Sequence, residues 1–151
     1  MIVWQKRVES VMAYWLLKTE PEEFSWDDLV KKGAKGEPWT GVRNFQARSN
    51  LKNMKKGDRA FFYHTGDEKQ IVGIAEVVRE HYPDPTDPTG KFLVVDAKAV
   101  APFPRAVTLA EIKADPRLKD MVLAKAPRLS VQPVTAEQWK TICAAGGAKE
   151  P

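Results

Sequence analysis

The sequence lacks the residues on which several classes of protein depend. Its 151 residues include one cysteine, Cys143, so no internal disulfide can form, and two histidines are too few for the usual Cys and His zinc sites. No apolar run approaches the roughly 18 residues of a membrane-spanning helix. The composition therefore predicts a protein of a reducing compartment that has neither a structural zinc nor a membrane span.

Common enzyme signatures are missing as well. The chain contains no G-x-x-x-x-G-K-[ST] phosphate loop, no G-x-G-x-x-G after a strand and no G-x-S-x-G nucleophile elbow. We therefore expect no cofactor and assign no catalytic residue. One alternative stays open: an enzyme in which His64, at the end of a predicted strand, is a general base with Glu20, Glu22, Glu23 or Lys18 beside it.

The length fits one domain, which we expect to span residues 13–147 between a leader at 1–12 and a tail at 148–151. Within it the patterns predict strands at 14–18, 59–65, 70–82 and 92–100, helices at 26–32 and 42–56, helices after Thr108 and Thr135, and two short strands within 121–134. The proline-rich segment 83–88 is predicted to be a rigid surface turn. Strands in a meander between helices indicate an α+β fold with a mixed, curved sheet that can close as a small barrel.

Positive charge is concentrated in one segment. Residues 31–59 hold nine Lys or Arg against Glu37 and Asp58, which is a local charge of +7, whereas the whole chain carries +4 and the remainder therefore −3. On the predicted helix in this segment the basic side chains share one side, and Ala47, Leu51 and Met54 face the core. Such a stripe suits the phosphates of a nucleic acid, although a solvated helix face would look the same.

Aromatic residues accompany the basic segment. Trp39 lies in a loop immediately before the predicted basic helix, beside Arg43 and Asn44, and core packing alone hardly explains it. Trp15 lies on the first strand, and a planar base can stack on such rings. Trp26 and Trp139, on predicted helices, are more simply core residues.

Four stretches together resemble a known family: YWLLKTEPEEFSWDDL, WTGVRNFQARSNLKNMKKGDRAFFYHT, IVGIAEVVREHYPD and MVLAKAPRLSVQPVT. They are similar to the EVE domain, over about residues 13 to 146. The resemblance implies a PUA-like fold, a mixed β-barrel flanked by short helices and related to the YTH and ASCH domains. It also implies a pocket for a modified nucleobase, with modified cytosine in DNA as the favoured ligand.

Carried over by position, the resemblance and the aromatic pattern give two sets of site residues. The expected base-binding pocket consists of Trp15, Lys18, Thr19, Trp39, Asn44, Tyr63, His64, Ser130 and Gln132. The expected phosphate-binding residues are Arg43, Arg48, Lys52, Lys55 and Arg128. In this hypothesis a base leaves its strand and stacks between Trp15 and Trp39 or Tyr63.

The expected partner is a nucleic acid with modified bases, DNA rather than RNA, bound by a monomer. We expect the protein in the cytoplasm if it is bacterial and in the nucleus if it is eukaryotic. A third reading, after the base reader and the His64 enzyme, is a protein-interaction module whose exposed aromatics form a patch.

Overall fold

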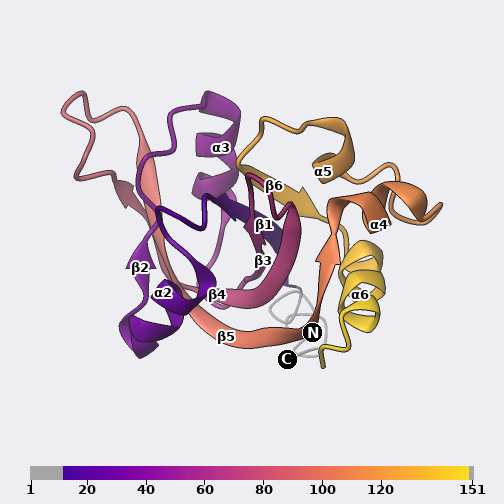
Figure 1. Cartoon of the computed structure of the whole chain (residues 1–151). Coiled ribbons are helices and arrows are strands. Elements are labelled where there is room, and N and C mark those ends of the chain that lie inside the picture. Colours follow the sequence, from indigo (N-terminus) through magenta and orange to yellow (C-terminus); the bar gives the residue numbers. More distant parts are fainter. Residues whose placement is uncertain (1–11, 150–151) are drawn as a thin grey trace, which may run out of the picture.

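The computed structural model describes residues 12–149, so most of the predicted leader and the last two residues of the tail lie outside the described part (Figure 1). Its strands form one six-stranded sheet in the order β2-β5-β4-β3-β1-β6. The strands are β1 (Tyr14–Thr19), β2 (Glu37–Pro38), β3 (Arg59–His64), β4 (Gln70–Pro83), β5 (Leu93–Thr108) and β6 (Val131–Val134). Because β1 and β3 are parallel and every other pair is antiparallel, the sheet is mixed, as predicted.

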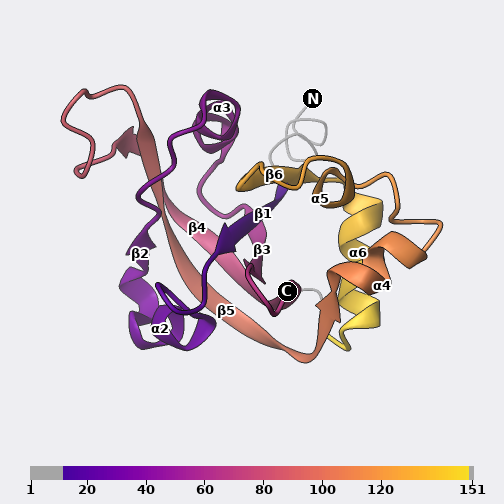
Figure 2. The same ribbon diagram turned by 45° about the horizontal axis from the view of Figure 1, so that its top comes forward.

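Short helices flank the curved sheet. They are α2 (Trp26–Lys31), the 3-10 turn η1 (Gly33–Lys35), α3 (Phe45–Asn53), α4 (Leu109–Ala114), α5 (Val122–Lys125) and α6 (Ala136–Ala145). In Figure 2, α2 and β2 lie at one end of the curved β4–β5 pair, and α4, α5 and α6 gather at the other. The α+β fold with short flanking helices confirms the expected fold class.

Side chains from both faces of the sheet are buried. Trp15, Leu17 and Phe62 belong to a first core that α2 and α3 cover, whereas Leu16 and Phe61 belong to a second core with residues of α4, α5 and α6. This two-sided burial explains why the strand sequences WLL and AFFY are continuously apolar, since alternate side chains point to opposite faces.

Capping side chains fix the starts of three helices as predicted. Ser25, Thr108 and Thr135 each accept a hydrogen bond from a backbone N–H three residues later, and the residue at that position bonds back to the cap. The predicted helix at 42–56 is shorter, because Asn44 is its N-cap and Met54 its C-cap.

Two strand predictions needed correction. The strand expected at 92–100 continues to Thr108 as β5, because long pairing with β4 overrides the prolines at 102 and 104. Of the two short strands expected within 121–134, only β6 forms. The first is the helical turn α5, whose end is closed by the bond from Ala126 N to Val122 O.

Gly73 allows close packing between the sheet and α2. A Cβ at this position would lie 2.6 Å from the ring of Trp26, a distance that carbon atoms do not adopt. The register between β3 and β4 also shifts beside it, between Phe62 and Tyr63. The sequence predicted either a bulge or a close approach at this glycine, and both occur. Among residues 12–149, no helix is long and apolar enough to cross a membrane.

Candidate functional site

A hollow of about 350 Å³ lies where the end of β1 meets β2. We call it the Trp39 hollow. Its lining residues come from the end of β1, the turn before α2, and β2 with the residues after it: Lys18, Thr19, Glu23, Phe24, Glu37, Pro38, Trp39 and Thr40. In Figure 2, β1 runs toward the α2 and β2 corner of the molecule, which is where these segments meet. The sequence had assigned three of them, Lys18, Thr19 and Trp39, to the base pocket.

The polar end of β1 forms a tight, hydrogen-bonded turn. The hydroxyl of Thr19 donates to the carbonyl of Phe24 at 2.9 Å, and the backbone N–H groups of Glu23 and Phe24 donate to the carbonyl of Glu20. The hydroxyl of Thr65 donates to the Glu20 carboxylate at 2.6 Å. These bonds fix Glu23 and Phe24 at the hollow.

Lys18 joins the hollow to a distant part of the chain. Its Nζ donates to the carbonyl of Pro127 at 2.6 Å and lies 5.7 Å from the centre of the Tyr63 ring. Burial lowers the pKa of Lys18 below its ordinary value. Because an ammonium group has three N–H donors, Lys18 keeps donors for a ligand after it has bound Pro127.

Trp39 is the aromatic wall of the hollow. It is 7% exposed and packs edge-on against Phe24 and Phe62, at ring-centre distances of 6.2 and 5.6 Å. Its backbone N–H donates to the carbonyl of Val95 at 2.8 Å, which ties the start of its loop to β5. The small exposed part of Trp39 therefore has a fixed position.

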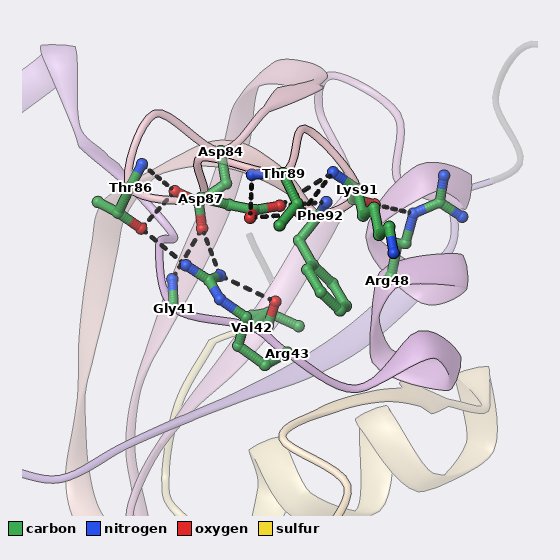
Figure 3. Close-up of polar contacts among 10 residues, drawn as sticks. All are labelled: Gly41, Val42, Arg43, Arg48, Asp84, Thr86, Asp87, Thr89, Lys91 and Phe92. Atoms are coloured by element: carbon green, nitrogen blue, oxygen red, sulfur yellow. Dashed lines mark hydrogen bonds and ion pairs between the residues drawn. The ribbon is translucent and has the colours of Figure 1, made fainter.

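The loop between β4 and β5 clamps the segment that follows Trp39 (Figure 3). Asp84 accepts hydrogen bonds from the backbone N–H of Gly41 at 3.0 Å and from Nη1 of Arg43 at 2.9 Å. Nη2 of Arg43 donates to the hydroxyl of Thr86 at 3.0 Å. The guanidinium assigned to phosphate binding thus holds Asp84, and we remove Arg43 from the phosphate set.

The same loop repeats one turn, Asp-Pro-Thr, at 84–86 and 87–89. In each copy the aspartate Oδ1 accepts from the backbone N–H and the hydroxyl of the threonine two residues later. Asp87 also accepts from the backbone N–H groups of Lys91 and Phe92. Figure 3 shows the resulting network, which supports the predicted rigid turn. Burial alone would raise the pKa of Asp84, but the bonds from Thr86, Gly41 and Arg43 lower it to about 2.

Two predicted pocket aromatics lie in the cores instead. Trp15 belongs to the same core as Trp39 and is equally buried, but its indole N–H donates to the buried carboxylate of Asp58 at 3.0 Å. Tyr63 is 3% exposed and belongs to the second core, on the opposite face from Trp39. Neither lines the Trp39 hollow. The predicted stacking of a base between Trp15 and Trp39 or Tyr63 is therefore replaced by a wall formed by Trp39 and Phe24.

His64 serves the fold through both ring nitrogens. Nε2 accepts the backbone N–H of Trp26 at 3.1 Å, so the proton of the neutral ring is on Nδ1, which lies 2.8 Å from the Glu68 carboxylate. That hydrogen bond lowers the pKa of Glu68. His64 is 7% exposed and does not line the hollow, so this arrangement provides no ring nitrogen for a substrate.

A second hollow, of about 300 Å³, contains other predicted residues. We call it the Asn44 hollow, and its lining residues are Asn44, Gln46, Ala126, Pro127, Arg128 and Leu129. The Asn44 side chain caps α3 by accepting the N–H of Ala47 at 2.9 Å. Because Lys18 lines the first hollow and binds Pro127 in the second, the two hollows are neighbours.

Gln132 of β6 and Ser130, which directly precedes β6, support this region. The carbonyl of Ser130 accepts the backbone N–H of Lys18 at 3.0 Å. Gln132 is fully buried, and its amide nitrogen donates to the carbonyls of Leu129 and Ala126. Neither residue lines the Trp39 hollow. Gln132 holds the 126–129 segment, and Ser130 holds the backbone of Lys18.

The basic residues of α3 lie on its exposed side, and Ala47, Leu51 and Met54 are fully buried as predicted. Nε of Arg48 donates to the carbonyl of Lys91 at 2.6 Å, and its two terminal nitrogens form no hydrogen bond with residues 12–149. Lys52, Lys55 and Arg128 are exposed. Within the same range, no cluster of His, Cys, Asp and Glu is placed to hold a metal ion.

The predicted base pocket omitted five lining residues of the Trp39 hollow: Glu23, Phe24, Glu37, Pro38 and Thr40. Of these, Glu23 had been considered only as an acid beside His64. Pro38 and Thr40 flank Trp39 directly, so their position next to a predicted site residue was a usable signal. Phe24 gave none, because its packing against Trp39 connects segments that no local pattern relates.

Comparison with known proteins gives consistent matches. A family model described as the EVE domain matches residues 13–145. Thymocyte nuclear protein 1 of Homo sapiens is 36% identical over 164 residues, which cover 87% of this chain and 73% of that protein. An NMR structure of a Rhodopseudomonas palustris protein is 59% identical, with a TM-score of 0.87 over 93% of this chain and 97% of the other.

One similar structure contains DNA. Human THYN1 protein in complex with 5-methylcytosine-containing DNA is 36% identical, with a TM-score of 0.81 over 92% of this chain and 99% of that one. The YTH domain of Zygosaccharomyces rouxii MRB1, solved with N6-methyladenosine RNA, is 16% identical with a TM-score of 0.57 over 94% and 88% of the two chains. The latter likeness shows a shared fold alone.

Proposed function

Because the chain belongs to the EVE domain family, we propose that it binds nucleic acid and holds a modified base in the Trp39 hollow. The observation that carries this proposal is the hollow itself. Its volume of about 350 Å³ falls in the range of roughly 300 to 1,000 Å³ that is usual for small-ligand pockets. The human relative solved with 5-methylcytosine DNA supports the class of ligand.

The lining residues suit a 5-modified cytosine. Trp39 and Phe24 offer aromatic surface, and the carboxylates of Glu23 and Glu37 can accept hydrogen bonds from the exocyclic amine of cytosine. Glu37 is also 3.4 Å from Lys32, so Glu23 is the freer acceptor. Lys18 can donate to a ring nitrogen or carbonyl of the base. These groups make DNA with a 5-modified cytosine the ligand we propose.

Discrimination by one methyl group is expected to be modest. Burial of a methyl group contributes about 0.8 kcal/mol, which corresponds to a factor of about four in affinity. A larger preference would require polar groups that contact the modification. The base must also leave its stack, which costs a few kcal/mol in a duplex and less where the strand is already unpaired.

Phosphates would bind outside the hollow. Arg48, Lys52, Lys55 and Arg128 are the cations we propose for this role, because they are at least partly exposed and come from α3, the residues after it and the Asn44 hollow. Their contribution does not depend on sequence or modification, and it falls as salt is added. They would supply affinity, and the hollow would supply selectivity.

A binding panel tests the proposal. Oligonucleotides that differ in one position, with cytosine, 5-methylcytosine, 5-hydroxymethylcytosine, adenine or N6-methyladenine, are titrated against the protein by fluorescence anisotropy. The expected result is tighter binding of a 5-modified cytosine than of cytosine. Trp39→Phe and Glu23→Gln should each reduce that preference, since one changes the aromatic wall and the other removes a charged acceptor.

Glu22→Gln is the matched control for Glu23→Gln, because Glu22 is the adjacent exposed glutamate and does not line the hollow. Circular dichroism confirms that each variant is folded. Equal affinities across the whole panel for the wild-type protein, with no effect of Trp39→Phe, would refute the proposal.

Binding without catalysis is part of this proposal, and the environment of His64 supports it. Both ring nitrogens are already engaged by Trp26 and Glu68. Extended incubation of the same oligonucleotides, analysed by mass spectrometry, should show no conversion. Turnover that His64→Ala abolishes while binding survives would instead favour the enzyme.

A further inference from the structure

Phe45 is the most exposed large hydrophobic side chain among residues 12–149, at 62%. It is the first residue of α3, and its ring stacks on that of Phe92 with a centre-to-centre distance of 5.1 Å and an angle of 27° between planes. We call these two rings the Phe45 platform. Because Phe92 covers one face of the Phe45 ring, the large exposed area leaves the other face open to solvent.

The loop between β4 and β5 fixes the position of Phe92. The backbone N–H of Phe92 donates to Asp87 at 2.9 Å, and its carbonyl accepts the N–H of Asp84 at 2.9 Å. The guanidinium of Arg43 lies 5.4 Å from the centre of the Phe92 ring. The close-up in Figure 3 shows Phe92 directed from this hydrogen-bonded loop toward α3. Because Phe45 packs on this fixed ring, its motion is restricted, and less conformational entropy is lost when a flat ligand stacks on its other face.

The charges around the platform are positive. Arg48 and Lys91 belong to the segments that form it, and Lys52 follows one helical turn after Arg48. Arg43 is also close, but its charge is paired with Asp84. The two acids of the loop that carries Phe92, Asp84 and Asp87, are buried and accept hydrogen bonds from the protein. An open aromatic face surrounded by cations matches a nucleobase with its phosphates, because any base can stack and the phosphates are anionic.

The platform also lies close to the Trp39 hollow along the chain. Phe45 follows Trp39 by six positions in the sequence, so their Cα atoms are at most about 22 Å apart. A nucleic-acid strand covers that distance in about six base steps, at about 3.4 Å each. One strand can therefore reach both places.

We propose that an unpaired base flanking the modified base stacks on the open face of Phe45. This inference rests on the proposed function, since it takes the strand to have one base in the Trp39 hollow. The stacked base carries no modification and is not selected by identity. The platform therefore adds affinity for single-stranded flanks and leaves the preference for the modified base unchanged.

An abasic scan tests the platform. Single-stranded oligonucleotides with one 5-methylcytosine carry an abasic site at each of the six positions on either side in turn. For the wild-type protein, one position should weaken binding by about 5-fold to 150-fold, the range for a lost stacking contact. Phe45→Ala should weaken binding of the complete oligonucleotide by the same factor, and the abasic site should then cost nothing further.

Val30→Ala is the matched control, because Val30 is 50% exposed on α2 and contributes to neither hollow. Phe45→Tyr should restore binding, since it keeps an aromatic face, whereas Phe45→Leu should not. The platform proposal is overturned if Phe45→Ala binds as tightly as Val30→Ala, if Leu substitutes as well as Tyr, or if the two losses add at every position.

The results that test the Phe45 platform can be distinguished from those that test the modified-base pocket. The ratio of affinities for 5-methylcytosine and cytosine should be the same in Phe45→Ala as in the wild-type protein. A wild-type ratio of one would contradict the modified-base pocket, whereas an absence of coupling between Phe45 and any flanking position would contradict the platform.

Discussion

Replacing Asp84 with asparagine should loosen the segment that carries Trp39. The Asp84 carboxylate accepts hydrogen bonds from Gly41 and Arg43 through one oxygen and from Thr86 through the other. An amide group has a single acceptor oxygen, so one of these two sets of donors loses its partner. A buried donor without a partner costs about 1 to 3 kcal/mol.

The pKa of Asp84 gives a second measure of the same effect. Its fall from the ordinary pKa of 3.8 to about 2 corresponds to about 2 kcal/mol as an upper limit, and to about 1 to 2 kcal/mol after allowance for solvent near this surface loop. Because the pKa is lower in the folded state, this stabilisation is complete above the unfolded pKa. It is lost as the pH falls through about 2.

Thermal denaturation followed by tryptophan fluorescence measures both effects. At pH 7 the Asp84→Asn variant should melt about 2 to 8 °C below the wild-type protein, since 1 kcal/mol shifts the Tm of a domain of this size by about 2 to 4 °C. The gap should narrow as the pH is lowered from 4 toward 2, because the wild-type carboxyl group also becomes neutral.

Asp67→Asn is the control, because Asp67 is exposed in the turn between β3 and β4. It should leave the Tm unchanged at every pH. A gap between wild type and Asp84→Asn that is absent at pH 7, or that stays constant down to pH 2.5, would show that the carboxylate does not hold the loop as described.

Two other changes test the fold and the charge distribution. Gly73→Ala should destabilise the protein by about 1 to 3 kcal/mol, because the new Cβ would lie 2.6 Å from the Trp26 ring. Urea denaturation measures this loss of stability, and an unchanged unfolding midpoint would contradict the packing. Combined Lys52→Gln and Lys55→Gln should reduce the slope of log affinity for DNA against log salt concentration by up to about 2. The control pair Lys113→Gln and Lys140→Gln, exposed on α4 and α6, should leave the slope unchanged. Equal slopes for both pairs would show that Lys52 and Lys55 do not bind phosphates.

Local patterns determined much of the fold. Ser25, Thr108 and Thr135 marked three helix starts because a capping box involves residues only three positions apart. Apolar runs predicted most of the strands, and the spacing of Ala47, Leu51 and Met54 predicted the buried side of α3. The segment 121–125 was misassigned because four residues of helix are too few to show a period.

The site depended on contacts that no local pattern contains. Alternation along β1 places Trp15 and Lys18 on opposite faces but does not say which helices cover each face. The bond to Asp58, 43 residues away, helps to fix Trp15 in the core. Arg43 looked like a phosphate ligand until the chain brought Asp84 to it. The sequence by itself determined which side chains are aromatic, charged and locally capped. Only the tertiary structure decided which of them meet, because pairing between distant strands and loops sets the partners of most buried polar groups.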